Sequence, residues 1–394
     1  MSEVYINNLE SKSEELEELD NNENLEDEKE LSIKRFDVAV YPADYTLSVL
    51  FEKLKSKDII VPEFQRGYVW TIKKASRLIE SFLLGLPVPP IYLYMRKDGK
   101  LLIIDGQQRC RTIQYFFEGK FPSGSKSIEF KLKFLDTNND EGDNNKSKWE
   151  NKGYKDLEDE DRRFLDSSVM RAFIIRQINP DDESSMFYIF ERLNTGGVSL
   201  EPMEIRKALY YGNLFKLIEK LNLNEYWRKI IGTEKPHKRL RDLEYILRFF
   251  ALYKEWKNYE APMKDFLTKF ITEYKDLDNK ELKSLENIFI KTVSYIYNSL
   301  GEKPFHTHKG KFDVEGRLAK FKRLNLAVMD AFMVGIATNI DKLNNDLDIL
   351  KNIYDSIKEN KDFYRNITER DTTRTKILKE RLELINRIIA KYTK

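Results

Sequence analysis

Hydrophobic residues change their spacing along the chain near residue 200. Before that point, short apolar or alternating runs predict strands, at residues 59–61, 91–95, 101–104, 128–135 and 169–176. Beyond it, apolar residues recur at helical spacing, most clearly at residues 242–256, 317–339, 343–358 and 372–392. The pattern therefore predicts an α+β domain followed by an all-helical domain.

Capping and turn residues predict how the first of these segments are joined. Thr46 and Thr71 each precede an apolar helical stretch, so their hydroxyls can accept hydrogen bonds from first-turn amides. Residues 97–100 place Asp and Gly between two strands, which is typical of a β-hairpin. The polar run at residues 137–153 is typical of a surface insertion loop.

Composition supports a folded protein of two or three domains. The chain has 394 residues, of which 41% are hydrophobic and 34% charged. It has no apolar run of about 18 residues and no basic start followed by an apolar stretch, so we expect neither a membrane span nor a secretory signal. A single cysteine, Cys110, excludes a disulfide framework and a zinc site built on several thiolates. We therefore expect a cytoplasmic protein.

Charge is unevenly distributed along the chain. Residues 1–30 hold twelve acidic residues and two lysines, a balance of −10, so the remaining 364 residues carry +12 within a total of +2. The basic body favours a phosphate-bearing partner. We expect residues 1–40 to form a disordered acidic arm, either a solvated tail or an electrostatic competitor for that partner. Residues 41–200 and 201–394 are the two predicted folded domains.

The first candidate binding segment lies between a predicted strand and a predicted helix. Phe64, Gln65 and Arg66 are followed by Trp70. An arginine and an amide in a short loop between aromatic side chains can hold a phosphate or stack on a base. The alternative is an ordinary strand-to-helix loop whose aromatic residues belong to the core.

The second candidate segment, residues 105–109, also joins a predicted strand to a predicted helix. A helix N-terminus offers unpaired amides and the positive end of the helix dipole, and Gly106 allows the backbone to approach an anion closely. Gln107 and Gln108 can donate to phosphate oxygens or orient a water, and Arg109 can pair bidentately with a phosphate. Asp105 can be the helix N-cap, a Mg²⁺ ligand through water, or a base that orients water.

The third candidate segment ends a predicted helix with two glycines. Its polar and glycine residues are Glu191, Arg192, Asn194, Thr195, Gly196 and Gly197. The glycines allow positive φ angles and an anion-binding nest, while the asparagine and threonine supply hydrogen bonds and the first two residues supply one charge of each sign. The alternative is a helix C-cap without a ligand.

Taken together, the three segments resemble the N-terminal domain family of GmrSD-type modification-dependent restriction enzymes. That family is marked by FQR with a following Trp, DGQQR and a FERLNTGG-like segment in this order, which correspond here to residues 64–70, 105–109 and 190–197. A helical signature also looks like that of the family and consists of Arg239, Asp242, Glu244 and Arg248 before two phenylalanines. The resemblance extends well over residues 45–255 and loosely beyond them.

The resemblance implies a ParB/sulfiredoxin-like α+β core with a small mixed sheet, followed by helices. It also implies nucleotide binding, NTP hydrolysis and DNA recognition in bacterial anti-phage systems. In two-part relatives an HNH-type nuclease domain follows, but His237, His306 and His308 do not have HNH spacing. The resemblance is therefore to a stand-alone module whose nuclease or other effector is a separate protein. The chain also has no P-loop pattern.

We therefore expect a nucleotide-binding, NTP-hydrolysing sensor module of a restriction or anti-phage system. In this interpretation Arg66, Arg109 and Arg192 neutralise phosphate charge, and the two glutamines position phosphate oxygens or the attacking water. Asp105 or Glu191 holds Mg²⁺ or aligns that water. Two alternatives are a DNA-binding module without turnover and a nuclease that uses the ParB-like core itself. A homo-oligomer is compatible with all three.

Three other features have structural interpretations. Cys110 lies on the apolar face of its predicted helix, which indicates a core position. Glu244 and Arg248 are spaced i, i+4, which favours an ion pair at the surface or between helices. His306 and His308 are interpreted as loop residues.

Overall fold

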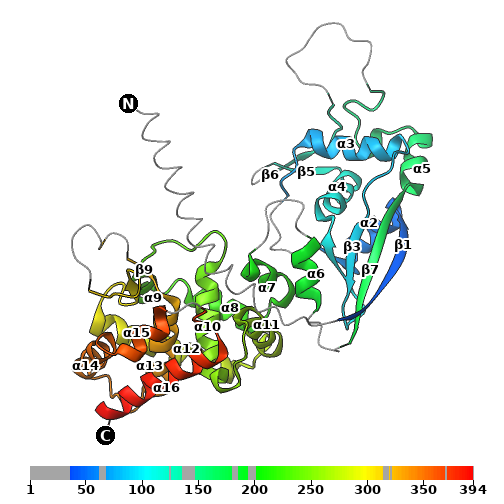
Figure 1. Ribbon diagram of the computed structural model, residues 1–394. Helices are drawn as coiled ribbons and strands as arrows, with labels where there is room; N and C mark the ends of the chain where they lie inside the picture. Colours follow the sequence, from blue (N-terminus) through cyan, green and yellow to red (C-terminus); the bar gives the residue numbers. More distant parts are fainter. Residues whose placement is uncertain are drawn as a thin grey trace, which may run out of the picture. The chain divides into compact units, whose positions relative to one another are not determined.

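The structure is a computed structural model that describes residues 36–61, 68–123, 126–134, 147–179, 185–193, 201–313, 319, 322–368 and 371–393. Its contacts divide the chain into two compact units (Figure 1). Residues 35–200 form the α+β unit and residues 201–394 form the helical unit. The predicted α+β class, with a mixed sheet followed by a helical C-terminal region, is confirmed.

A five-stranded mixed sheet forms the centre of the α+β unit, in the order β1–β7–β3–β4–β2. The strands are β1 (Asp37–Thr46), β2 (Ile59–Ile60), β3 (Ile91–Met95), β4 (Leu101–Asp105) and β7 (Val169–Asn179). The pairs β1–β7 and β3–β4 are antiparallel, whereas β3–β7 and β2–β4 are parallel. Because β2 and β4 are parallel neighbours, their carboxyl ends point in the same direction. Val61 and Gly106, which follow these two strands, therefore lie toward the same end of the sheet.

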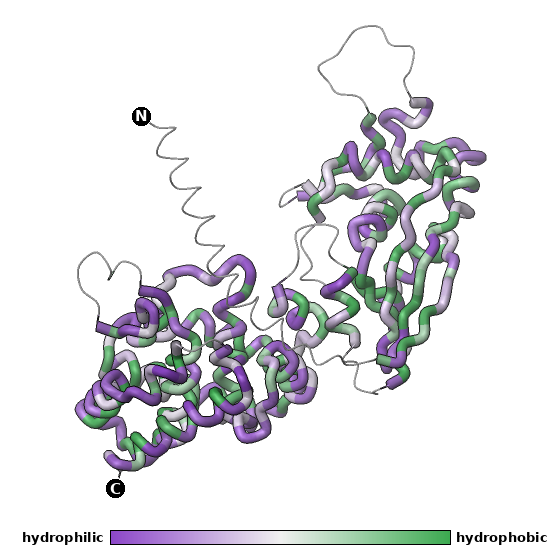
Figure 2. The backbone as a smooth tube through the Cα atoms, viewed as in Figure 1, coloured by the Kyte–Doolittle hydropathy of each residue, from purple (hydrophilic) through white to green (hydrophobic). Residues whose placement is uncertain are grey.

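Helices bury both faces of strand β4. The helices of this unit are α2 (Leu47–Lys55), α3 (Ile72–Leu83), α4 (Gln107–Glu118), α5 (Asp159–Ser167) and α6 (Ser185–Leu193). Leu101 and Ile103 of β4 belong to the core that α2, α3 and α4 share. Leu102 and Ile104 point to the opposite face and are also buried, and α6 packs against this strand. Figure 2 shows hydrophobic residues concentrated along the strands of this unit.

The predicted caps and hairpin of this unit are confirmed. Thr46 and Thr71 are the N-caps of α2 and α3, where their hydroxyls accept from the amides of Val49 at 3.4 Å and Lys74 at 3.3 Å. Strands β3 and β4 form the antiparallel pair that the turn at residues 97–100 predicted. Local sequence signals thus determine where helices α2 and α3 begin and where the β3–β4 hairpin turns.

Two expectations about residues 128–153 are corrected. A small second sheet pairs β5 (Lys120–Ser123) with β6 (Lys126–Glu129), so the strand predicted at 128–135 ends at Glu129. The alternation beyond it comes from irregular backbone whose Phe130 and Leu132 side chains enter the core. Residues 147–153 are not simply a surface loop, because Trp149 is buried and donates from Nε1 to Asp161 at 2.8 Å. A short 3₁₀ helix, η2 (Tyr154–Asp156), follows.

The helical unit is built around a helix that is buried on all sides. Its elements are α7 (Pro202–Tyr210), α8 (Asn213–Leu221), α9 (Glu225–Ile231), α10 (Arg241–Glu255), η4 (Trp256–Asn258), α11 (Met263–Tyr274), α12 (Asn279–Leu300), β8 (His306–Thr307), β9 (Arg323–Leu324), α13 (Leu326–Thr338), α14 (Leu347–Lys358), α15 (Lys361–Thr368) and α16 (Thr375–Tyr392). Helix α13 is the central one, and α10, α12 and α16 pack around it. None of the helices in the described ranges is long and apolar enough to cross a membrane.

The charged signature at the start of α10 connects helices. Glu244 pairs with Arg206 of α7 at 2.8 Å, and Arg248 pairs with Asp330 of α13 at 2.5 Å. Asp242 pairs with Arg228 of α9 at 2.7 Å. The Glu244 and Arg248 side chains therefore make interhelical ion pairs, but with partners that their i, i+4 spacing did not indicate.

The histidines predicted in a loop belong to a small pairing of strands. His306 lies in β8, which pairs antiparallel with β9 so that Thr307 is opposite Arg323. His308 forms an isolated bridge with Lys311. The loop interpretation is wrong for His306 because β9, which completes the pair, comes from a segment 16 residues further along the chain.

Candidate functional site

Strand β4 passes directly into helix α4 through a single glycine. Asp105 is the last residue of the strand, Gly106 is the helix N-cap with φ +96°, and Gln107 begins the helix. No side chain caps this helix end, so Asp105 is not the N-cap that the sequence left open. The amides of the first helical turn have no carbonyl four residues earlier in the helix to bond to, which leaves them available to an anion.

Gly106 is required by both its conformation and its surroundings. Its φ angle lies in the left-handed region, which side chains rarely adopt. A Cβ atom added here would lie 2.4 Å from Cγ2 of Ile91 and 3.1 Å from Nη2 of Arg109. The Ile91 and Arg109 side chains therefore pack directly against this turn, and only a glycine fits between them.

Arg109 is held at the junction by one of its nitrogens. Its Nη2 donates to Oδ2 of Asp105 and to the carbonyl of Pro90, both at 3.0 Å. Its Nε is buried and has no hydrogen-bond partner among the described residues, and only 17% of the side chain is exposed. The guanidinium is thus oriented by Asp105 and Pro90 while part of its donor capacity stays unused.

The two glutamines of this segment differ in their surroundings. Oε1 of Gln107 is buried and accepts no hydrogen bond from the described part of the chain. Oε1 of Gln108 accepts from the amide of Val69 at 3.1 Å, so this side chain connects α4 to the segment that follows Phe64, Gln65 and Arg66 in the chain. Gln107 therefore has a free acceptor at the junction, whereas the acceptor of Gln108 serves to position a neighbouring segment.

A second hydrogen-bonded connection fixes the same segment. The hydroxyl of Thr112 donates to the carbonyl of Gln108 at 2.7 Å, so the Tyr68 hydroxyl, 2.8 Å from it, is the donor in that contact. Burial raises the pKa of Tyr68 to about 12. Tyr68 and Val69 thus anchor one end of the first candidate segment against α4, and Val61 begins its other end beside β4.

The first candidate segment is described only at its flanks. Phe64, Gln65 and Arg66 lie outside the described residues. Trp70 is half-buried against the core, and Nζ of Lys74 lies 4.8 Å from the centroid of its ring. Trp70 therefore has a structural environment just before the N-cap of α3.

The third candidate segment is described up to the end of α6. Phe190 is fully buried, Glu191 is partly buried and Arg192 is exposed. Residues 194–197, with Asn194, Thr195, Gly196 and Gly197, lie outside the described residues. Helix α6 packs against β4, the strand that ends at Asp105, so two of the three candidate segments belong to elements in contact.

The described residues do not assemble the donor set of a resident metal ion. They contain no group of three or more His, Cys, Asp or Glu side chains placed to hold a metal. Asp105 is paired with Arg109, a cation that competes with Mg²⁺ for the same carboxylate. Cys110 is fully buried, as predicted, and burial raises the pKa of its thiol to about 12, which excludes a reactive thiolate at neutral pH.

Three residues at the junction were not found by sequence reasoning. They are Pro90, whose carbonyl holds Arg109; Ile91, which lies against Gly106; and Tyr68, which is bonded to α4. The position of Tyr68 between the FQR residues and Trp70 was a usable signal. The contacts of Pro90 and Ile91 arise only because β3 pairs with β4, and nothing near them in sequence indicates these contacts.

Comparison with known proteins relates most of the α+β unit to one protein family. Residues 47–211 match the family described as the GmrSD restriction endonuclease, N-terminal domain. The match begins at the first residue of α2, includes the β4–α4 junction and α6, and ends just after α7. No curated protein matches the chain.

Proposed function

We propose that this chain, whose residues 47–211 belong to the GmrSD restriction endonuclease N-terminal domain family, is the nucleotide-binding and NTP-hydrolysing module of a restriction system. The nucleotide phosphates would lie at the β4–α4 junction. The observation that carries this proposal is the start of α4, where no side chain caps the helix and the Arg109 guanidinium is fixed beside the turn at Gly106. Backbone amides and an arginine together form a recurrent phosphate-binding arrangement.

Asp105 acts in this proposal as a positioning residue for Arg109. The carboxylate lies i, i+4 from the arginine and holds Nη2 at 3.0 Å, together with the Pro90 carbonyl. A guanidinium that is already oriented loses less side-chain entropy when a phosphate binds. Oδ2 of Asp105 accepts this bond, and the carboxyl group is 41% exposed, so it can also accept from a water beside the phosphates.

Gln107 is the residue we assign to the attacking water. Its Oε1 is buried in the first turn of α4 without a hydrogen-bond partner, and a water molecule can supply the missing donor. Gln108, by contrast, would act indirectly by holding Val69 and the segment before it. Glu191, Arg192 and the FQR residues remain proposed contributors. Mg²⁺, if required, would enter with the nucleotide phosphates, and no step is assigned to it.

The proposal is tested by calorimetric titration of NTPs into the full chain, beside a phosphate-release assay. Arg109→Ala removes a charge-assisted contact worth about 1.5–3 kcal/mol, so we expect nucleotide affinity to fall about ten-fold or more. Arg109→Lys should restore little, because an ammonium cannot reproduce the planar fork. Gln107→Ala should lower turnover more than affinity.

Arg77→Ala is the matched control, since Arg77 is an exposed arginine on α3 of the same unit. It should bind and hydrolyse NTPs as the wild type does. Wild-type nucleotide affinity in Arg109→Ala, accompanied by a much lower melting temperature, would show that Arg109 is only structural. Cleavage of duplex DNA that depends on Asp105 would instead support a nuclease in this unit.

A further inference from the structure

The positive charge of the folded protein is concentrated in the helical unit. Residues 35–200 contain 26 basic and 25 acidic residues, a net charge of +1. Residues 201–394 contain 39 basic and 29 acidic residues, a net charge of +10. The unit that lies almost wholly beyond the matched family segment is therefore the one with an electrostatic preference for polyanions.

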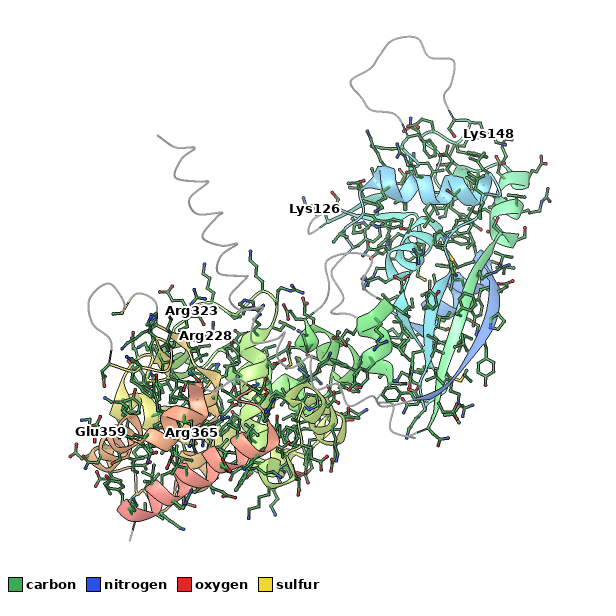
Figure 3. All side chains as sticks on the ribbon, viewed as in Figure 1. Lys126, Lys148, Arg228, Arg323, Glu359 and Arg365 are labelled. Atoms are coloured by element: carbon green, nitrogen blue, oxygen red, sulfur yellow. The ribbon has the colours of Figure 1, made fainter. Side chains whose placement is uncertain are left out.

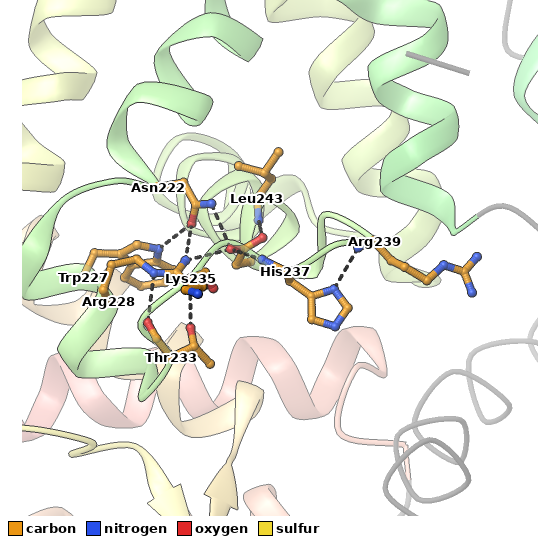
Figure 4. A network of polar contacts seen from close by, with 9 residues as sticks. Asn222, Trp227, Arg228, Thr233, Lys235, His237, Arg239 and Leu243 are labelled. Carbon is orange, nitrogen blue, oxygen red and sulfur yellow. Dashed lines mark hydrogen bonds and ion pairs between the residues drawn. The ribbon is translucent and has the colours of Figure 1, made fainter. Parts of the chain in front are cut away.

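A buried network fixes a basic loop between α9 and α10 (Figure 4). Oδ2 of Asp242 accepts from Nη1 of Arg228 at 2.7 Å and from the amide of His237 at 2.9 Å. Arg228 also donates to the carbonyl of Thr233 at 3.0 Å and to the carbonyl of Lys235. Hydrogen bonds from side chains of α9 and α10 thus hold the backbone of this loop in place. The side chains of Lys235 and Lys238 are exposed.

This loop adjoins the β8–β9 pair. The amide of Lys303 donates to the carbonyl of Lys229 at 3.2 Å, at the end of α9. A Cβ added to Gly232 would lie 2.8 Å from Cε of Lys303 and 3.2 Å from Nε2 of His306. Burial, together with the charges of Lys303 and Lys322, lowers the pKa of His306 to about 4. Lysines from both sides of the strand pair therefore gather around this histidine.

Six exposed basic side chains on this loop and strand pair define what we call the basic face: Lys235, Lys238, Lys303, Lys309, Lys311 and Arg323. Within the described ranges, none of the six forms an ion pair with a carboxylate. Three acidic residues, Glu234, Glu302 and Asp313, lie within two positions of them in the chain, and the last already binds Lys358 at 3.0 Å. Figure 3 shows Arg323 of this face and Arg228 of its anchoring network.

We propose that the basic face binds the phosphate backbone of duplex DNA. Lysines and an arginine that pair with no carboxylate among the described residues, on a backbone held by hydrogen bonds, suit an extended row of phosphates. Restriction acts on DNA, so the choice of partner rests on the proposed function. The contacts are with phosphates, so binding through this face is independent of base sequence. The helical unit would thus have a DNA-binding role that is separate from the proposed nucleotide site in the α+β unit.

The test measures binding of the full chain to a duplex of about 20 base pairs across a salt series, by fluorescence anisotropy. The variant carries Lys235→Gln, Lys238→Gln, Lys311→Gln and Arg323→Gln. Each phosphate contact contributes about 0.9 to the slope of log affinity against log salt. We expect the variant to bind at least ten-fold more weakly at about 0.1 M salt, with a slope smaller by roughly 2–4.

The matched control removes the same charges from α16 through Lys376→Gln, Lys379→Gln, Arg387→Gln and Lys391→Gln. In Figure 1, α16 lies apart from β9 within the helical unit. The control should keep the wild-type slope. An equal loss in both variants, no loss in the first, or loss of binding only to a single-stranded RNA of the same length would overturn the proposal. Calorimetric NTP titration of the basic-face variant should match the wild type, which separates this test from that of the nucleotide site.

Discussion

At the level of single residues, Gly106 offers a direct test of the junction geometry. Gly106→Ala introduces strain from its φ of +96° and also an overlap with the buried Ile91 side chain. Gly119, the C-cap of the same helix, has φ +71° but nothing within 4 Å of an added Cβ. We expect Gly119→Ala to lower the free energy of unfolding by about 1–2 kcal/mol, and Gly106→Ala to lower it by at least about 2 kcal/mol more.

Urea unfolding of the two variants, followed by circular dichroism, checks this difference. Equal losses of stability would mean that the Ile91 side chain moves aside without an energetic penalty and that the turn has room for a Cβ atom. A larger loss in Gly106→Ala supports the close packing of Ile91 against the turn beside the proposed phosphate site.

At the level of elements, three buried charges connect α10, α13 and α16. Arg248 and Arg381 are both buried, and the buried carboxylate of Asp330 pairs with Arg248 at 2.5 Å. Nη1 of Arg381 donates to the carbonyls of Asn366 and Thr372, while Nε and Nη2 have no partner. Burial lowers the pKa of Arg381 to about 10, and the charge of Asp330 acts in the opposite direction.

This arrangement predicts an asymmetry between two substitutions. Asp330→Asn removes the carboxylate that pairs with Arg248 and whose charge acts on Arg381, whereas Arg248→Met leaves Arg381 and Asp330 as one charge of each sign. Breaking a buried ion pair costs about 3–5 kcal/mol, and we expect Asp330→Asn to be the more damaging change. Chemical denaturation of the two variants measures how far each substitution lowers the free energy of unfolding. Glu380→Gln, which removes a surface partner 3.9 Å from Lys376, should cost under about 1 kcal/mol. A larger loss in Arg248→Met would contradict the shared counter-charge.

At the level of the whole molecule, the acidic N-terminal residues and the basic helical unit carry opposite charges of similar size. Residues 1–30 carry −10 and residues 201–394 carry +10. If the acidic residues compete with DNA phosphates for the basic face, their deletion should raise duplex affinity at low salt, and the gain should fade at high salt as charges are screened. Anisotropy titrations at about 0.05 M and 0.3 M salt check this.

A full-length variant with every Asp and Glu of residues 1–30 changed to Asn or Gln is the control for chain length. If charge is the cause, this variant should show the same rise in duplex affinity at low salt as the deletion does. Affinity that stays at the wild-type value in both variants would identify the segment as an inert tail.

Local sequence determined the parts of this protein whose causes lie within a few residues of one another. Threonine hydroxyls at 46 and 71 reach first-turn amides three residues away, and the turn at 97–100 closes the β3–β4 hairpin. The strand–glycine–helix junction at 105–109 was also predictable, because Gly106 provides the turn and the apolar face of α4 places Cys110 in the core. Two further motif segments, residues 64–66 and 194–197, lie outside the described residues, so their predicted roles stay predictions.

Only the tertiary structure decided which partners the charged and polar side chains take. Arg248 and Asp330 are 82 residues apart, and Gln108 meets Val69 across 39 residues, so no local spacing indicates either contact. Trp149 enters the core from a polar stretch, and Asp161, 12 residues further along the chain, accepts its indole N–H. Capping and helical periodicity depend on residues that are close together in the sequence. The pairing of buried charges depends instead on which helices pack together. For that reason, the sequence alone identified the strand–glycine–helix junction at residues 105–109, and the fold decided that the Pro90 carbonyl also holds Arg109 there.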